Sequence, residues 1–461
     1  MRTDHSFVVV AVVCGALGAC GGSVAGNPPN QGTPDAGDDG GMGMPTPDAG
    51  TGNPEGSVSD AMEEPAVDHG APSSTYPAFK PDMGQIVDNG GITLSSPVVV
   101  SITWNSDSSQ TMFDQFADEI GASKYWATTT TEYGVGPAMS GMANHVHMTT
   151  AAPASLADSD LQGMVMTNAG VAWPAPTTQT IYAFFLPPGT SLLFGGGGGG
   201  GGGDACMQGI GGYHDQVMAN GQTVAYAVVP SCTFGQGTPA NEQSTMSMSH
   251  ELIEAATDPH PQDNNPGYVG FDPNHFAFDD FQRFSSETGD ACEFFRDSFY
   301  QQMETSFTFW VQRTWSNQSG AAGHNPCVPV PAEPYFNVTP LDLATVNIDE
   351  SQLGGPAMAP TKGVHILGGQ TATFQVGFYS DAATSGPWTI KAVSGNPVAG
   401  GGTASTALTA SVDKSSGVNG EKAYVTVTVK TPSTRLKGEL LTIVSSLNGT
   451  DHYMPILIGS E

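Results

Sequence analysis

The segment SHELIEAATDPH, residues 249–260, decides how the central part of this chain is interpreted. It is typical of a helix, and at about 100° per residue His250 and Glu254 lie one turn apart on the same face. An imidazole and a carboxylate at that spacing can reach one divalent ion. Glu251 lies beside them, where the Glu of H-E-x-x-H metallopeptidases is the general base that activates water. The pattern H-E-x-x-E therefore predicts a metal site with Glu251 as a catalytic residue.

The Glu in place of the second His changes the chemistry that the site can support. A carboxylate ligand donates negative charge, so the ion is a weaker Lewis acid than one held by imidazoles alone. Harder ligands also let other divalent ions compete with zinc. We expect Zn²⁺ as the cofactor, with another divalent cation as the alternative.

A third ligand must come from another part of the chain. Glu287 is the favoured candidate, because a downstream carboxylate completes many H-E-x-x-H sites, with Asp290 as its partner or as the ligand itself. His260, ten residues after His250, is the alternative at the end of the helix. His214 comes close to the preceding strand and is expected to line the same cleft as a second catalytic group.

Around this segment the pattern predicts a mixed α/β domain of zincin-like organisation, residues 79–330. Short apolar and β-branched runs indicate strands, and an Asn220-Gly221 turn joins two of them as a hairpin, residues 210–217 and 223–229. We expect the second hairpin strand to align an extended substrate by edge pairing. The remaining predicted strands are 97–104, 145–149 and 180–186, and the predicted helices are 112–121, 123–133, 156–167 and 241–258.

Residues 331–461 lose the helical periodicity and alternate in the manner of strands. The predicted strands are 371–379, 388–393, 424–430, 440–446 and 452–458. Short strands with turn signals between them are typical of an immunoglobulin-like β-sandwich. The fold class expected for the whole chain is therefore α+β, with a zincin-like domain before a β-sandwich.

Four cysteines fall inside the mixed domain: Cys206, Cys232, Cys292 and Cys327. An exported protein meets an oxidising compartment, so two disulfides are expected, and four cysteines allow three connectivities. We favour Cys206–Cys232 and Cys292–Cys327. A four-thiolate zinc site is the rival, but the spacings contain no C-x-x-C.

The N-terminus predicts export. Residues 1–19 have one Arg, a short apolar run and small residues before Cys20, which is similar to the lipobox of a bacterial lipoprotein signal peptide. Residues 20–78 are rich in Gly, Pro and Asp and are expected to form a disordered linker. The chain is thus expected in a bacterial cell envelope, held by lipid on Cys20 at the outer surface or the periplasmic face, with membrane contact through that anchor only.

Composition limits the partners. The net charge is −31, with 13 Lys and Arg against 44 Asp and Glu. Binding to nucleic acid needs clustered basic residues, so nucleic acid is excluded as a partner. A peptide or a cell-surface polymer is the expected substrate.

Several segments in residues 80–330 resemble the EXORDIUM/phosphate-induced protein family of plant extracellular proteins. They match in order: the strand 98–104 ending in Trp, CMQGIGGYH at 206–214, HELIEAATDP at 250–259, ETGDAC at 287–292, and FWVQRTWSN at 309–317 followed by Cys327. In this chain a Gly, Gly211 or Gly212, takes the place of the family's Cys before Gly-Tyr-His, and His260 has no counterpart. The resemblance implies an extracytoplasmic, surface-associated protein that carries this site.

The function expected from these features is that of a cell-surface lipoprotein acting as a zinc metallopeptidase. His250, Glu254 and Glu287, or Asp290, hold the ion, and Glu251 deprotonates water. The alternative is a non-catalytic surface protein that binds a polysaccharide or a protein partner, with a structural or vestigial metal site.

Overall fold

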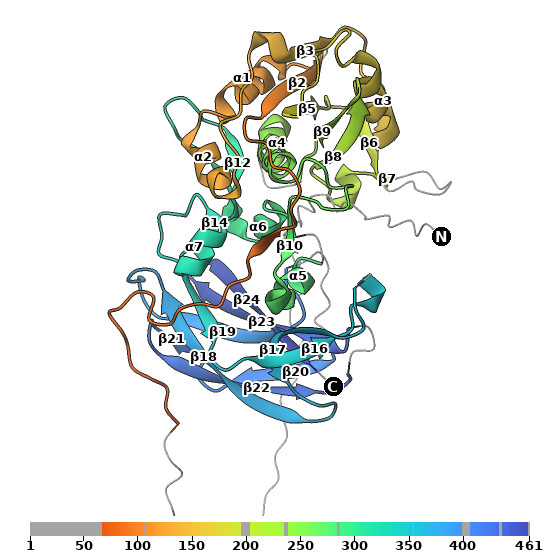
Figure 1. Cartoon of the computed structure of the whole chain (residues 1–461). Coiled ribbons are helices and arrows are strands. Elements are labelled where there is room, and N and C mark those ends of the chain that lie inside the picture. Colours follow the sequence, from red (N-terminus) through yellow and green to blue (C-terminus); the bar gives the residue numbers. More distant parts are fainter. Residues whose placement is uncertain are drawn as a thin grey trace, which may run out of the picture. The chain divides into compact units, whose positions relative to one another are not determined.

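A computed structural model describes residues 67–459, apart from 106, 195–202, 235–237, 284–285, 354, 399–405 and 433–435. It shows a mixed α+β fold with several sheets (Figure 1). The predicted signal peptide of residues 1–19, the predicted acylation site Cys20 and the predicted linker up to residue 66 lie outside the described residues. No helix in the described part of the chain is both long enough and apolar enough to cross a bilayer.

A five-stranded sheet forms the centre of the mixed domain. Its strand order is β3-β2-β5-β9-β8, in which β3, β2, β5 and β9 run parallel and β8 is antiparallel to β9. The β8–β9 turn places Asn220 and Gly221 at positive φ, which matches the hairpin signal in the sequence. The strands are β2 Val98–Trp104, β3 His145–Met148, β5 Thr180–Phe185, β8 Tyr213–Ala219 and β9 Gln222–Val229.

Helices cover both faces of this sheet, because successive strand residues point to opposite sides (Figure 1). Val99 of β2 packs in the same apolar cluster as Phe116 and Leu252, whereas its neighbour Val100 packs with Leu161. One face is thus covered by α1 Gln110–Ile120, α2 Lys124–Thr130 and α4 Ala240–Thr257, and the other by α3 Asp158–Asn168. The predicted helices are confirmed, with ends shifted by a few residues.

The order of strands corrects one expectation. Strand β9, residues 222–229, is hydrogen-bonded on both sides, to β5 and to β8, so it has no edge to offer a substrate. The edge strands of this sheet are β3 and β8, and β8 carries His214. The sequence favoured β9 because its run is more apolar, but that apolar character reflects burial in the sheet interior.

The segment between α4 and residue 331 consists of short helices and strands. Strand β10 pairs with β1, and the Cys292–Cys327 disulfide joins α6 to β14. The elements are β1 Ile86–Asp88, β10 Tyr268–Phe271, α5 Phe276–Phe281, α6 Asp290–Glu293, β11 Phe299–Gln301, β12 Trp310–Gln312, β13 Thr314–Trp315, α7 Asn317–Ala322 and β14 Cys327–Val328. A smaller sheet contains β4 Ser155–Ala157, β6 Ser191–Phe194 and β7 Gly203–Asp204.

Beyond residue 331 the chain forms two sheets, one in the order β15-β18-β22-β20 and one in the order β16-β17-β24-β23-β19-β21. All five predicted strands are present, as β18, β19, β22, β23 and β24. The C-terminal strands are β15 Phe336–Pro340, β16 Ala344–Ile348, β17 Ala359–His365, β18 Thr371–Ser380, β19 Trp388–Ser394, β20 Leu408–Val412, β21 Ser416–Gly417, β22 Lys422–Val429, β23 Gly438–Leu447 and β24 Thr450–Gly459.

One apolar cluster continues across residue 331. It contains Val376 and Ile443 from the two C-terminal sheets, and also Phe278 and Trp315 from the segment before them. The last part of the predicted linker is also ordered, because the Asn419 side chain donates to the carbonyls of Ser73 and Thr75. Backbone carbonyls of this segment are therefore hydrogen-bonded to Asn419, a residue more than 340 positions away that the composition of the linker could not indicate.

Candidate metal centre

Helix α4 carries charged groups into the interior. His250, Glu251 and Glu254 are each no more than 2% exposed, on a helix whose Leu252 and Ile253 pack against the sheet. Acidic residues are almost never fully buried unless they are paired or bind a cation. The buried polar face of α4 therefore needs compensating partners, and the residues around it indicate what those partners are.

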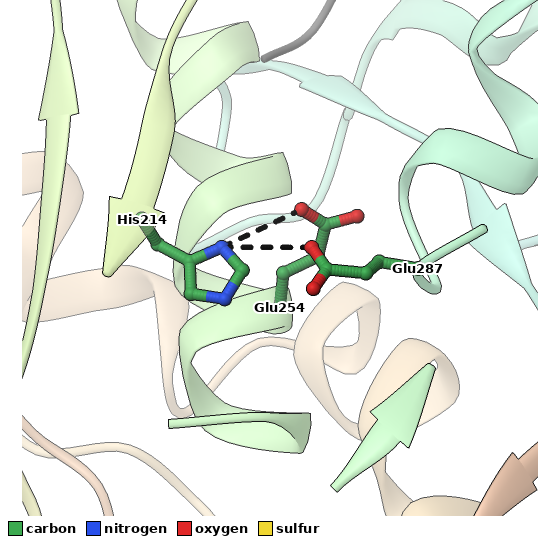
Figure 2. A group of neighbouring side chains, drawn as sticks. All are labelled: His214, Glu254 and Glu287. Carbon is green, nitrogen blue, oxygen red and sulfur yellow. Dashed lines mark ion pairs between the residues drawn. The ribbon is translucent and has the colours of Figure 1, made fainter. Parts of the chain in front are cut away.

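His214, Glu254 and Glu287 converge from three elements (Figure 2). Nδ1 of His214 lies 3.7 Å from Oε2 of Glu254 and 3.7 Å from Oε2 of Glu287. Oε2 of Glu251 lies 3.8 Å from the same nitrogen. These contacts are longer than a hydrogen bond of ~2.8 Å, and close to the roughly 3.3–3.6 Å between ligands placed tetrahedrally around one ion.

The tautomer of His214 agrees with metal binding. Its Nε2 lies 3.2 Å from the backbone carbonyl of Asp258, which can only accept, so Nε2 carries the hydrogen. In the neutral ring, Nδ1 then presents a lone pair to three carboxylate oxygens. A lone pair facing carboxylates is unfavourable, so Nδ1 either carries a proton there, as the raised pKa of His214 indicates, or faces a bound cation. A metal-binding His donates its other N–H to a carbonyl in this way.

A second group shares Glu254. Nε2 of His250 lies 2.9 Å from Oε2 of Glu254 and 3.5 Å from Oδ1 of Asp290. Gln312 donates from Nε2 to the carbonyl of Gly289 at 2.8 Å, which fixes its amide so that Oε1 accepts from Nδ1 of His250 at 3.0 Å. Nε2 of His250 therefore faces the acidic group. Burial would lower the pKa of His250, but Glu254 and the neighbouring carboxylates raise it, so Nε2 either carries a proton or faces a bound cation.

The loop before α6 is bound to the helix by Glu254. Its Oε1 accepts backbone N–H groups from Gly289 at 2.9 Å and from Asp290 at 3.0 Å. These bonds hold the carboxylate in one orientation and leave Oε2 to face both histidines. The Cys292–Cys327 disulfide fixes the other end of α6, so Asp290 is held from both sides.

Two glycines let the backbone approach these side chains. A Cβ on Gly212 would lie 2.6 Å from Oε1 of Glu251, and a Cβ on Gly289 would lie 2.6 Å from Nδ1 of His250. Both distances are far inside van der Waals contact. The glycine at 212 is thus required by the packing around Glu251.

The buried carboxyl groups of this site outnumber its histidines, which are the nearby groups that can carry positive charge. Burial raises the pKa of Glu251 and raises the pKa values of Glu287 and Glu293 well above their ordinary range. Burial also disfavours charged Glu254, but His250 and His214 lower its pKa to about 2. Burial would lower the pKa of His214, yet Glu287 and the neighbouring carboxylates raise it well above its ordinary value.

Buried polar atoms without hydrogen-bond partners gather in the same place. They are Nε2 of His250, whose contact with Glu254 is poorly aligned for a hydrogen bond, Oε1 of Glu251 and Oε2 of Glu293. Orphaned buried polar atoms are costly. Nε2 of His250 belongs to one of the two possible ligand groups, so a cation bound there would satisfy it, whereas Glu251 and Glu293 lie outside both groups. The residues therefore fit a divalent metal ion.

The structure groups the predicted site residues in a way the sequence left open. Asp290 joins His250, while Glu287 joins His214, and Glu254 belongs to both groups. His260 belongs to neither group found among the described residues, and its Nδ1 lies 3.5 Å from Asp263 instead. Access is narrow, because Glu287 is 16% exposed while the other grouped side chains are at most 3% exposed.

Two functional residues were missed from the sequence. Glu293 lies three positions after Asp290, so the spacing on a short helix could have identified it. Gln312 is 62 residues from His250, and no local pattern connects them.

Both favoured disulfides are confirmed. Cys206 is bonded to Cys232, and Cys292 to Cys327. Disulfides persist in oxidising compartments, so the pair indicates an extracytoplasmic protein that carries a buried His/Glu site able to hold a metal ion.

Comparisons with known proteins add little to this geometry. No family model matches the chain, and no curated protein matches it. Among solved structures, the crystal structure of domains 4 and 5 of the S-layer protein SbsC is 14% identical over 34% of this chain and 88% of that chain, with a TM-score of 0.16. A likeness at this TM-score supports no conclusion about fold or function.

Proposed function

We propose that this chain is an extracytoplasmic metal-dependent peptidase whose centre lies on α4. The observation that carries the proposal is the approach of Glu254, Glu287 and Glu251 to the Nδ1 lone pair of His214, at 3.7, 3.7 and 3.8 Å. His214, Glu254 and Glu287 would hold the ion. A peptide bond is the substrate expected for an H-E-x-x-E helix beside a sheet edge.

Each residue has a role in this mechanism. A bound divalent ion supplies Lewis-acid polarisation of the substrate carbonyl. Glu251 accepts the proton of the attacking water at Oε2, the oxygen that faces Nδ1 of His214. Strand β8, at the edge of the sheet, aligns an extended substrate by backbone pairing beside His214. Glu287, the most exposed member of the site, marks the side from which substrate and water approach.

The ligand set favours Zn²⁺ or Mn²⁺. Imidazole suits zinc, whereas two or three carboxylates suit harder ions and reduce the acidity that the ion confers on water. We therefore expect slower hydrolysis than in sites with three imidazoles.

A second candidate function is non-catalytic. The burial of the site, with side chains 1–3% exposed apart from Glu287, is typical of a structural ion that fastens α4 to the loop at 286–293. In that case the chain binds a polysaccharide or a protein partner through another surface.

The rest of the chain agrees with either function. We propose an EXORDIUM-like, zincin-like domain followed by an immunoglobulin-like sandwich, held to a bacterial membrane through lipid on Cys20. The helix–sheet pairing of α4 with β9 and the two C-terminal sheets support the two domain assignments.

The test compares matched substitutions on one helix in the full chain. Glu251→Gln should keep the metal, measured by elemental analysis, and slow the cleavage of quenched fluorogenic peptides by about 10²–10⁴-fold. Glu242→Gln, in the first turn of α4, is the control and should change neither quantity. Full cleavage by Glu251→Gln contradicts the peptidase proposal. Stoichiometric metal without cleavage by the native chain establishes the non-catalytic function instead.

A further inference from the structure

The two histidines of the centre cannot serve one ion in this arrangement. Ligands about 2.1 Å from a single ion lie at most about 4.2 Å apart. Among the described residues, no group whose ligand atoms all lie within 4.8 Å of one another contains both His214 and His250. Each imidazole belongs to its own group, and each has its own carboxylate, Glu287 or Asp290.

Both rings are nevertheless prepared as ligands. The backbone carbonyl of Asp258 accepts a hydrogen bond from the His214 ring, and the amide oxygen of Gln312 accepts one from the His250 ring. Such outer contacts fix the tautomer and orientation of metal-binding imidazoles. In a group without an ion, the histidine would instead have to carry a buried positive charge to offset its carboxylates.

Glu254 connects the two groups through a single atom. Its Oε1 is occupied by the N–H groups of Gly289 and Asp290. Its Oε2 is the oxygen that faces Nδ1 of His214 and Nε2 of His250. A carboxylate oxygen shared between two ligand groups is the arrangement of a bridging ligand.

The charge of the cluster agrees with two cations. Glu251, Glu254, Glu287, Asp290 and Glu293 act on one another electrostatically within the buried site. Without a nearby cation, burial favours the protonated forms of Glu251, Glu287 and Glu293, whereas a cation in each group would offset the charged carboxylates of that group. Uncompensated buried charge is strongly unfavourable, so a second divalent ion stabilises the cluster.

We propose that the centre binds two divalent cations bridged by Oε2 of Glu254. The first is held by His214 and Glu287 and the second by His250 and Asp290. This inference deepens the proposed function, on whose site it rests, by making it a two-metal centre. In such centres the ions clamp both the attacking and the leaving atoms of a hydrolysis.

The experiment counts ions in the full chain. After loading with Mn²⁺ and desalting, elemental analysis should give two ions per chain, and the electron paramagnetic resonance spectrum should show an exchange-coupled pair. His214→Ala and Asp290→Asn should each reduce the count from two to one and convert the spectrum to that of an isolated ion. The controls are His324→Ala and Asp263→Asn, whose side chains are 52% and 53% exposed, and both should keep two coupled ions.

The native chain decides the inference even if a variant fails to fold. One ion per chain with an uncoupled spectrum overturns it, as does an unchanged count in both site variants. Two coupled ions without peptide cleavage overturn the peptidase function and leave the two-ion centre standing. One ion with cleavage that depends on Glu251 does the reverse.

Discussion

Glu254 accepts the backbone N–H of Gly289 at 2.9 Å, although the two residues are 35 positions apart in the chain. This bond ties the last turn of α4 to the loop that carries Glu287 and Asp290. It also fixes which oxygen of Glu254 faces the histidines, so one contact sets both the backbone path and the ligand geometry.

The substitution Glu254→Gln tests that double role. The amide oxygen can still accept from Gly289, so the fold should persist by circular dichroism. The ligand charge is lost, and an amide NH₂ facing His250 and His214 repels a cation. We expect metal affinity to fall at least ~100-fold in chelator competition, beyond the ~10–100-fold typical of outer contacts alone. An unchanged affinity would remove Glu254 from the ligand set.

Gly289→Ala tests the packing over His250. The added Cβ would lie 2.6 Å from the imidazole, and overpacking of this kind costs about 1–3 kcal/mol of unfolding free energy. Metal affinity should fall with it because the ring must move. Urea unfolding and metal titration measure the two effects.

The matched control is Gly163→Ala within α3, where a Cβ would meet nothing within 4 Å. Alanine in a helix interior is favoured over glycine, so this variant should gain about 0.5–1 kcal/mol and keep its metal affinity. A Gly289→Ala variant as stable as the native chain would show that the loop can move away from His250 without lowering the unfolding free energy.

Loss of the second disulfide should weaken both stability and metal binding. Cys292 and Cys327 are 35 residues apart, and closing a loop of that length contributes about 3–4 kcal/mol by chain entropy. Cys292→Ser with Cys327→Ser frees α6 and thereby Asp290. Cys206→Ser with Cys232→Ser, across 26 residues, should lower stability similarly and reduce metal affinity less. Equal losses of affinity would show that the disulfide near Asp290 has no special role.

A polar cluster away from the site predicts a pH dependence of stability. His275 lies 2.7 Å from Asp272 and 3.2 Å from Asp82, which Lys362 contacts at 2.7 Å. Contact with His275 lowers the pKa of Asp82 from 3.8 to about 2, so its contribution is lost as pH falls from about 4 toward 2. Burial opposes charged His275, but Asp272 and Asp82 raise its pKa above 6.5. Its contribution is therefore present below pH 6.5 and lost as pH rises through the raised value.

His275→Gln should flatten the alkaline side of that profile. Because these groups are partly exposed and screened by solvent, we expect the substitution to remove about 1 kcal/mol of the pH-dependent change in unfolding free energy. Urea midpoints from pH 5 to pH 9 measure it, with His324→Gln as the control. A native profile that stays level above pH 6.5 contradicts the assignment.

Local patterns predicted the elements that carry the site. The i,i+4 spacing of His250 and Glu254, the Asn220-Gly221 turn and the β-branched strands each depend on neighbours within one element, and the structure confirms those elements. The two disulfide pairings, favoured among three connectivities, are also confirmed: Cys206–Cys232 closes the hairpin region, and Cys292–Cys327 ties down the segment after the site.

Contacts between distant segments were not predictable. Nothing near His214 indicates that its ring faces Glu287, 73 positions later, because a parallel sheet and a returning loop must both form first. The apolar pattern of residues 223–229 gave the strand but not its interior place. The division of carboxylates between His214 and His250 depends on Gln312, which side-chain type alone does not mark as part of a site.

The enclosure of Glu254 beneath a loop that Cys292 and Cys327 lock has a consequence for biogenesis. The Glu254 side chain is 3% exposed, so a cation should reach Oε2 slowly, from the side on which Glu287 is 16% exposed, and fastest while the loop is still open before the disulfide forms. After that, release should follow the rate of local unfolding, and a chelator added to the finished protein should act slowly however high its concentration.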